Sequence, residues 1–165
     1  MGLPLRRYMH APTFMLANVI IDVEPLLVLT LGVGYPLHGY LHTFLSAFFL
    51  GLLLGSTMFL LERPFRTLYK AFLLETGRDL KPKSFMLAGA TGTMLHVLLD
   101  SPLYDDIRPL YPLAANPFYD PGSALLVYSL CVWLGLLGIA YYASLLGYSA
   151  LRRPPCSKKG TTVQL

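Results

Sequence analysis

Long apolar stretches separated by clusters of positive charge constrain the fold of this chain more than any other feature. Four such stretches lie at roughly residues 11–33, 40–61, 84–100 and 123–149. A helix needs about 20 residues to cross a bilayer, and only the third stretch is short of that length. Only 13% of the residues are charged, against about 25% in a soluble domain. The sequence therefore predicts an all-α, polytopic integral membrane protein with about four transmembrane helices.

The first apolar stretch contains an acidic interruption, IDVEP, at residues 21–25. Pro25 disfavours helical backbone at Glu24, so we expect the first transmembrane helix to be broken near Asp22–Pro25. Non-helical backbone at membrane depth must be buried in protein or line a wet cavity. Because the stretch carries these acids and no clear small-residue cleavage site, we interpret it as retained rather than as a cleaved signal.

The positive charges predict the orientation of the helices. Apart from Arg108, the lysines and arginines fall within residues 6–7, 63–83 and 152–159, and the net charge is +4. By the positive-inside rule, both termini and the basic loop 62–83 should be cytoplasmic, which agrees with four crossings of the cell (plasma or inner) membrane. Nucleic-acid binding would need such charges on one folded surface, so we expect no nucleic-acid partner.

We expect a single domain. Residues 1–150 would form the helical transmembrane domain, and the polar, proline-rich residues 151–165 a disordered cytoplasmic tail. Within loop 62–83, apolar residues recur at helical spacing among basic ones, which fits either an interfacial helix on anionic lipid or a solvated connector. Cys131 and Cys156 indicate neither a disulfide nor a thiolate metal site. No feature of the sequence indicates an oligomeric state.

Three of the histidines take part in pairs of side chains four residues apart, a spacing that shares one face of a helix. HGYLH places His38 beside His42, and HVLLD places His96 beside Asp100. We expect the second transmembrane helix to begin at His38 and the third to end at Asp100. Both pairs then lie at the non-cytoplasmic boundary, each with one member about 6 Å deeper than the other. Two neighbouring helices would present three imidazoles and a carboxylate at one depth.

Asp22 and Glu24 add two carboxylates to these pairs. Ionisable groups within a spanning segment are costly and mark candidate functional sites. Carboxylates and imidazoles without cysteine suit a divalent metal, with Zn²⁺ as the first choice and Mn²⁺ or Fe²⁺ as alternatives, in a site of one or two ions. The candidate ligands are Asp22, Glu24, His38, His42, His96, Asp100 and His10. In one continuous helix His10 would lie about 18 Å from Asp22, so either His10 does not touch the metal or the first segment is not a simple crossing.

A simpler interpretation makes these histidines interface residues at helix ends. One pair alone would fit either view, but two pairs at one depth, with acids nearby, favour a metal site. The aromatic residues of loop 101–122 also match an interfacial belt.

The order of these motifs resembles that of the YdjM-type membrane-bound metal-dependent hydrolases, whose pattern is an N-terminal histidine, a PDxD-like acid pair, an HRxxTHS-like histidine pair and then HxxxD before a proline-rich segment. Here the corresponding segments are His10, IDVE, HGYLHTF and HVLLDSPLYDDIRPLYPL, over roughly residues 8–118. The chain departs from that pattern at four positions, which are Ile21, Glu24, Gly39 and Thr43. There is a looser likeness, through HxxxD, to zinc-dependent phospholipase C enzymes. The resemblance implies a metal-dependent hydrolase without naming a substrate.

From these residues we expect an enzyme in which a metal activates water to hydrolyse an ester. A site at the membrane boundary faces lipid headgroups, so membrane lipid is the expected substrate and a lipid phosphoester the natural class. Glu24 is the candidate general base, and Arg108, the one cation on that side, is a candidate for holding the substrate anion. Arg108 equally suits pairing with Asp105 or Asp106. The alternatives are a hydrolase acting on a peptide or amide, a divalent-metal carrier and a structural helical bundle.

Overall fold

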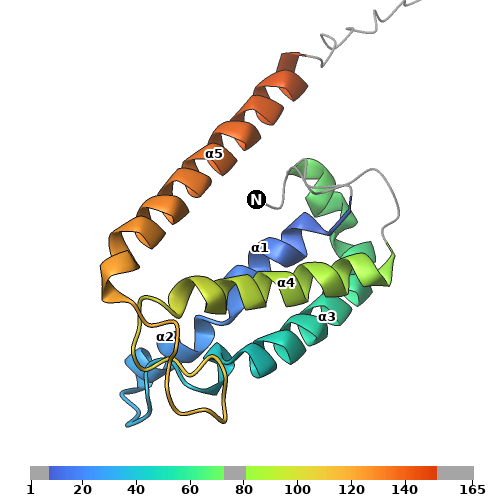
Figure 1. Ribbon diagram of the computed structural model, residues 1–165. Coiled ribbons are helices and arrows are strands. Elements are labelled where there is room, and N and C mark those ends of the chain that lie inside the picture. The colour runs from blue at the N-terminus through green and yellow to red at the C-terminus, as the bar shows by residue number, and fades with distance from the viewer. Residues whose placement is uncertain (1–7, 73–80, 152–165) are drawn as a thin grey trace, which may run out of the picture.

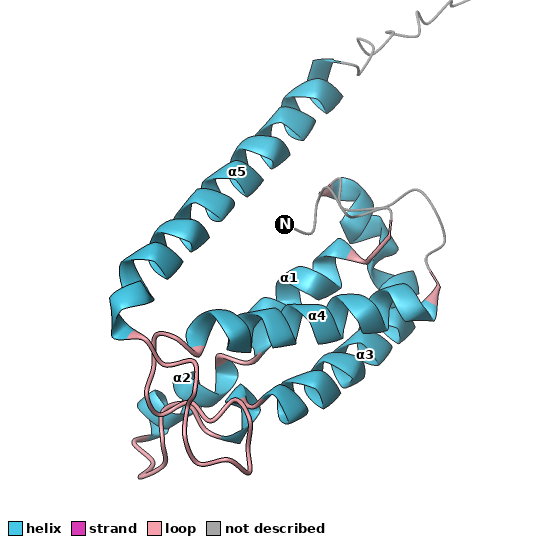
Figure 2. Ribbon diagram, in the orientation of Figure 1, coloured by secondary structure: helices cyan, strands magenta, loops and turns pink. Residues whose placement is uncertain are grey.

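The computed structural model describes residues 8–72 and 81–151, and this part of the chain is helical, without strands (Figures 1 and 2). The predicted all-α class is therefore confirmed. The α-helices and the two 3-10 turns are α1 Ala11–Ile20, α2 Val23–Leu31, η1 Tyr40–His42, α3 Phe44–Ala71, α4 Pro82–Asp100, η2 Pro121–Ser123 and α5 Ala124–Leu151. The predicted tail lies outside the described residues, except Leu151, which ends α5.

The first apolar segment is interrupted where the sequence predicts, between α1 and α2. Pro25 has no N–H to donate to the carbonyl of Ile21 one helical turn before it. The N–H of Glu24 donates to that carbonyl instead, at 3.2 Å, and the N–H of Asp22 donates to Val19 at 3.1 Å. These tighter bonds, three residues apart, separate the two helices. Asp22 stands at the break as the residue before α2, and its side chain makes no capping hydrogen bond.

Three segments are long and apolar enough to cross a membrane: Ala11–Leu31 taken as a whole, Phe44–Ala71 and Pro121–Ser149. The third predicted segment, 84–100, corresponds to α4, which has 19 residues and is not among the three. The described helices thus fit a membrane protein, whereas four crossings and cytoplasmic termini stay predictions.

Helix α4 packs lengthwise between α1 and α3 (Figure 1). Glycines allow the close approach of α3 and α4. A Cβ atom at Gly51 would lie 2.5 Å from Oγ1 of Thr93 and 2.6 Å from Cα of Ala90, and one at Gly89 would collide with the carbonyl oxygen of Gly51. Small residues at helix contacts are typical of membrane proteins, where backbones approach closely. The hydroxyl of Thr93 also donates to the carbonyl of Ala47, at 2.7 Å, across this contact.

The other side of α4 contacts α1 through equally small groups. A Cβ atom at Gly92 would lie 2.6 Å from Cβ of Ala17, and Ala11, Thr13 and Ala17 on α1 are buried. Close packing on two sides therefore fixes α4 relative to both neighbours. Most of the buried residues of α4 are glycine, alanine or threonine, with Phe85 and Val97 as the larger exceptions.

The predicted connector 62–83 is partly helical. Helix α3 continues through this basic region to Ala71, with Pro64 inside the helix, and bends toward its C-terminal end (Figure 1). A proline removes one helical hydrogen bond and is a common cause of such a bend. Residues 73–80 lie outside the described part of the chain.

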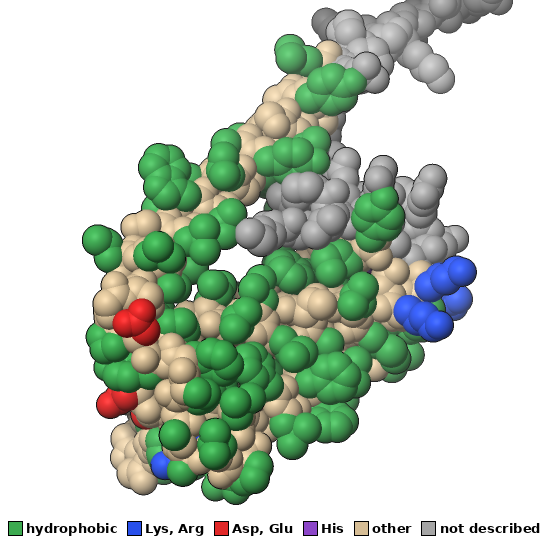
Figure 3. Space-filling view, in the orientation of Figure 1, with side chains coloured by type: hydrophobic (Ala, Val, Ile, Leu, Met, Phe, Trp, Pro, Cys, Tyr) green, Lys and Arg blue, Asp and Glu red, His purple; other side chains and the backbone are tan. Residues whose placement is uncertain are grey.

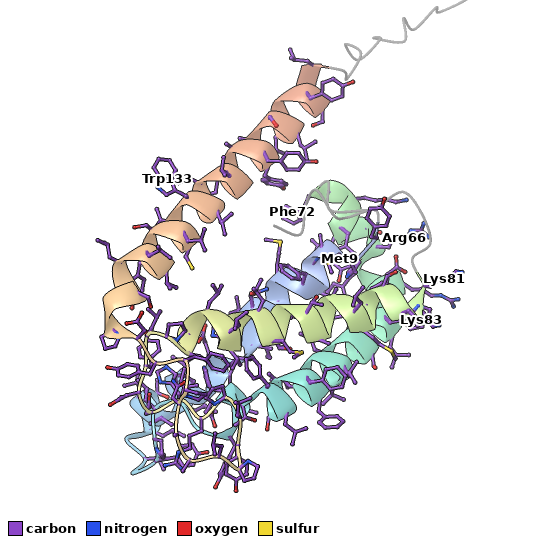
Figure 4. All side chains as sticks on the ribbon, in the orientation of Figure 1. Met9, Arg66, Phe72, Lys81, Lys83 and Trp133 are labelled. Atoms are coloured by element: carbon purple, nitrogen blue, oxygen red, sulfur yellow. The ribbon has the colours of Figure 1, made fainter. Side chains whose placement is uncertain are left out.

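Helix α5 lies largely apart from the other long helices (Figure 1), although the hydroxyl of Tyr142 donates to the carbonyl of Phe72, at the end of α3, at 2.8 Å. In its most apolar window only 6% of the residues are buried. Hydrophobic side chains cover its visible face in Figure 3, and the labelled Trp133 projects away from the bundle in Figure 4. The loop 101–122 joins α5 to the end of α4, where most of the predicted site residues gather.

Candidate metal centre

Four predicted ligands meet at one end of the helical bundle. Asp22, His42, His96 and Asp100 each offer one ligand atom, and these atoms all lie within 4.8 Å of one another. The residues come from three parts of the fold, which are the break between α1 and α2, the turn η1, and the last turns of α4. Within the described residues, 8–72 and 81–151, these four side chains form a group that could hold a metal ion.

The imidazole of His96 lies between two carboxylates. Its Nε2 atom is 3.2 Å from Oδ1 of Asp22 and 3.1 Å from Oδ2 of Asp100, one helical turn further along α4. Despite these short distances, Nε2 of His96 is buried without a hydrogen-bond partner, and so is Nε2 of His42. Buried polar atoms in native proteins almost always have partners. Two unpartnered imidazole nitrogens beside two carboxylates are the arrangement that a bound cation would complete.

The other ring nitrogen of His42 is held by Glu24. Nδ1 of His42 lies 3.1 Å from Oε2 of Glu24, which also accepts the backbone N–H groups of Gly39 and Leu41 at 3.1 Å each. An ionised carboxylate favours a proton on Nδ1, so the lone pair of Nε2 is directed to the cluster. Metal-binding histidines are commonly oriented by a carboxylate or carbonyl in this way. The ring of His96 makes a comparable hydrogen bond to the backbone of Asn18.

Glu24 was expected to bind the metal or to act as general base, and the structure places it behind His42. Its Oε2 atom is occupied by two N–H groups and an imidazole, and the hydroxyl of Tyr35 lies 3.4 Å from Oε1. Glu24 is not one of the four clustered residues. Its contacts make it a residue that positions His42 and organises residues 39–42.

His38 is paired with Asp106, a residue that the sequence did not suggest as its partner. Nδ1 of His38 lies 2.8 Å from Oδ1 of Asp106, and the N–H of His38 donates to Oδ2 at 3.0 Å. Burial would raise the pKa of Asp106, but these hydrogen bonds outweigh it and hold that pKa below its usual range. The His38 ring lies edge-on to His42, with 4.8 Å between ring centroids, and beside the ring of Tyr104 at 4.2 Å. His38 thus borders the cluster without being one of its four members.

The prediction that His38 and His42 share a helix face is wrong. Helix α3 begins only at Phe44, and His42 lies in the 3-10 turn η1. Thr43 ends the turn and caps α3 by accepting the N–H of Ser46 at 3.1 Å. The N–H of Phe44 donates to Pro109 at 2.9 Å, so the turn is tied to the loop that follows α4. The pair His96–Asp100, in contrast, has the predicted spacing of one turn on α4.

His10 lies apart from the cluster, at the opposite end of α1 from Asp22. Its Nδ1 atom caps α1 by accepting the N–H of Thr13 at 3.3 Å, and its ring stacks on Phe85 with 4.2 Å between centroids. Burial lowers the pKa of His10 to about 4, which makes the ring neutral near pH 7. His10 therefore has a structural role as a buried helix cap.

A small pocket of about 130 Å³ is lined by His38 and Asp106, and His38 in turn contacts His42 of the cluster. Arg108 lines it together with Tyr35, Tyr40 and Tyr111. Arg108 is exposed, and no ion pair joins it to Asp105 or Asp106 within the described chain. Asp22, whose side chain is 53% exposed, leaves the cluster accessible from outside.

Comparison with known proteins assigns the chain to no family. No family model, curated protein or solved structure matches it. The resemblance to the YdjM-type hydrolases therefore rests on the short motifs alone, and the chemistry of the site has to be argued from its own geometry.

Proposed function

We propose that this chain is a membrane-embedded, metal-dependent hydrolase that cleaves a lipid phosphoester. One observation carries the proposal, which is the convergence of four ligand atoms within 4.8 Å, two of them on imidazoles with buried, unpartnered nitrogens. Exposed acidic clusters arise without any metal, but two buried imidazole nitrogens without hydrogen bonds, beside two carboxylates, are better satisfied when a cation binds between them.

The donor atoms fit Zn²⁺ well. Two histidines and two aspartates supply nitrogen and oxygen ligands without sulfur, as in many zinc sites, and Mn²⁺ or Fe²⁺ accept the same ligands. Four ligands fill one tetrahedral site, so we propose one ion for each chain. Asp22 is the most exposed of the four and makes no capping bond, which makes it the ligand best able to yield its place to water or substrate.

When bound, the metal would supply a hydroxide at neutral pH and polarise the bond under attack. The surrounding residues would have separate tasks. Glu24 holds His42 in the tautomer that a metal ligand needs. Nδ1 of His38 faces Asp106, which leaves Nε2 of His38 as the ring nitrogen that can exchange a proton. We propose His38, rather than Glu24, as the group that takes up or returns a proton during hydrolysis.

The substrate class follows from the pocket beside the cluster. Arg108 is an exposed cation in a pocket that also contains His38, and a guanidinium binds phosphate through paired hydrogen bonds. The pocket volume of about 130 Å³ suits a headgroup better than a whole lipid. Acyl chains would remain in the surrounding bilayer, beside the apolar faces of the helices.

A divalent-metal carrier or a structural bundle would be the alternative to an enzyme. A carrier needs access to its site from both membrane faces, whereas the ligands here gather at one end of α4. A structural bundle would not need unpartnered imidazoles. These considerations favour the enzyme, and turnover separates the enzyme from both alternatives.

The test is hydrolysis of lipid phosphoesters by the detergent-purified chain, before and after chelation and after return of Zn²⁺, Mn²⁺ or Fe²⁺. We expect turnover that disappears with the metal and returns with it. Arg108→Gln should raise KM with little change in metal content, because Arg108 is not a ligand. A metal-loaded wild type that hydrolyses neither phosphoesters nor carboxylic esters or amides would contradict the proposal.

A further inference from the structure

A second pocket, of about 710 Å³, lies at the other end of the bundle from the metal cluster. The last turns of α3 and the first turn of α4 form it. Phe85 lines this pocket and His96 belongs to the cluster, so the two sites are about 17 Å apart along the axis of α4. Neither the metal nor the proposed hydrolysis uses it.

Positive charge dominates the rim of this pocket. Arg63 and Arg66, three residues apart on α3, lie on one face of the helix, and Lys81 adds a third cation from the start of α4. Glu62 is the one carboxylate among the lining residues. Figure 3 shows Lys and Arg atoms gathered at this end of the molecule, and Figure 4 shows Arg66, Lys81 and Lys83 close to one another there.

The start of α4 is itself favourable for an anion. The positive end of a helix dipole normally attracts acidic residues, yet the first turn of α4 contains none, includes Lys83 and is preceded by Lys81. The side chain of Lys81 makes no capping hydrogen bond. Lysines placed at the positive end of a helix repel it, and a bound phosphate would relieve that repulsion.

The floor of the pocket is apolar and rigidly packed. Phe85 is only 1% exposed, stacks on His10 and lies 5.4 Å from Phe59 between ring centroids. On the outer side, Leu60 is 76% exposed. A free phosphate ion would make no favourable contact with this apolar surface, whereas a lipid would place its acyl chains along it.

We propose that this pocket binds the phosphate headgroup of an anionic phospholipid, with the acyl chains lying along Phe59 and Leu60. Basic pockets between membrane helices on the cytoplasmic side are known to bind anionic headgroups. Binding here would hold the end of α3 against the start of α4. The site is independent of the metal centre and of the reaction proposed for it.

The experiment measures how many phospholipids the detergent-purified full chain retains, by native mass spectrometry. The probes are phosphatidylglycerol, phosphatidylcholine as its zwitterionic counterpart, and inorganic phosphate as a competitor. We expect wild type to retain phosphatidylglycerol in preference to phosphatidylcholine, with little displacement by inorganic phosphate. Full displacement by inorganic phosphate would show a site for the free anion, and equal retention of both lipids would also overturn the proposal.

Two double variants separate the pocket from general charge. Arg63→Gln with Lys81→Gln should weaken phosphatidylglycerol binding by about 30-fold, at ~1 kcal/mol for each cation. Lys158→Gln with Lys159→Gln removes the same charge from the C-terminal tail and should leave binding unchanged. Equal losses in both variants would contradict a specific pocket. Glu62→Gln, which removes the opposing carboxylate, should strengthen binding by about fivefold, a gain that misfolding cannot produce.

Discussion

Helices α4 and α5 are both rich in apolar and small residues, yet one is packed on two sides and the other stands apart. The glycines of α4, Gly89 and Gly92, are in contact with α3 and α1, and a Cβ atom at either would collide with neighbouring atoms. The glycines of α5, at 135, 138 and 147, have nothing within 4 Å. Apolar composition therefore predicts a helix, but only the position of the small residues decides whether it packs.

This difference matters for the metal centre, because α4 carries two of its ligands. Packing of α4 against α1 brings His96 and Asp100 to Asp22 at the break. Packing against α3 brings them to His42 in the turn before α3. We therefore expect substitutions that disturb the packing of α4 to affect the metal centre more than substitutions on α5.

The strongest test replaces one glycine on each helix by leucine. Gly89→Leu should destabilise the fold by at least about 3 kcal/mol and abolish metal binding, because the side chain would meet the backbone of α3. Gly138→Leu should change stability by less than about 0.5 kcal/mol, since nothing lies near it. Denaturant unfolding in detergent and metal content measure both. Equal effects of the two variants would contradict the comparison.

Within the packed region, substitutions of the ligands should remove the metal while leaving the helices intact. His96→Gln or Asp100→Asn takes one of four donors from the cluster, and each should leave less than about a tenth of the wild-type metal after dialysis. Circular dichroism should show unchanged helix content. A variant that keeps its full metal complement would exclude that residue as a ligand.

Glu24→Gln should have a smaller effect, because Glu24 touches the imidazole of His42 and is not one of the clustered residues. Loss of such a supporting carboxylate typically weakens metal affinity by about 10–100-fold. Competition with a chromophoric chelator gives the affinity. An affinity as low as that of His96→Gln would instead make Glu24 a ligand.

The smallest predicted effect is that of Asp106→Asn. Because its folded pKa lies below the ordinary value of 3.8, Asp106 contributes stability that is complete above that pH and is lost as the pH falls through the folded pKa. At pH 7 the variant should melt about 2–4 °C below wild type, as expected for loss of ~1 kcal/mol. Thermal melts across the acid range should show the two curves converging below pH 3.8. A gap that persists there would assign the effect to something other than the charge of Asp106.

Much of this arrangement is predictable from local sequence. The break at Asp22 follows from Pro25, and the pairing of His96 with Asp100 follows from helical periodicity, so both were found. The turn at His42 was missed, because the same four-residue spacing fits a helix. What prevents a helix there is distant in sequence: Glu24 takes the N–H groups of Gly39 and Leu41.

The partner of His38 was missed for the same reason. Asp106 is 68 residues away from His38, and only folding of the loop after α4 brings the two together. The acid pair at 105–106, separated from HVLLD by four residues, is the available signal. It was connected with Arg108, its neighbour in sequence, rather than with a histidine. Long-range contacts of loops are the part of a site that periodicity does not reveal.

The central claim is that Asp22, His42, His96 and Asp100 hold one divalent ion, and elemental analysis of the detergent-purified chain tests it most directly. The comparison is wild type with the double variant His42→Ala/Asp100→Ala, both checked for helix content. We predict one equivalent of Zn, Mn or Fe in wild type and none in a still-helical double variant. A well-folded wild type that holds no metal even after reconstitution, or a double variant that keeps it, would contradict the account.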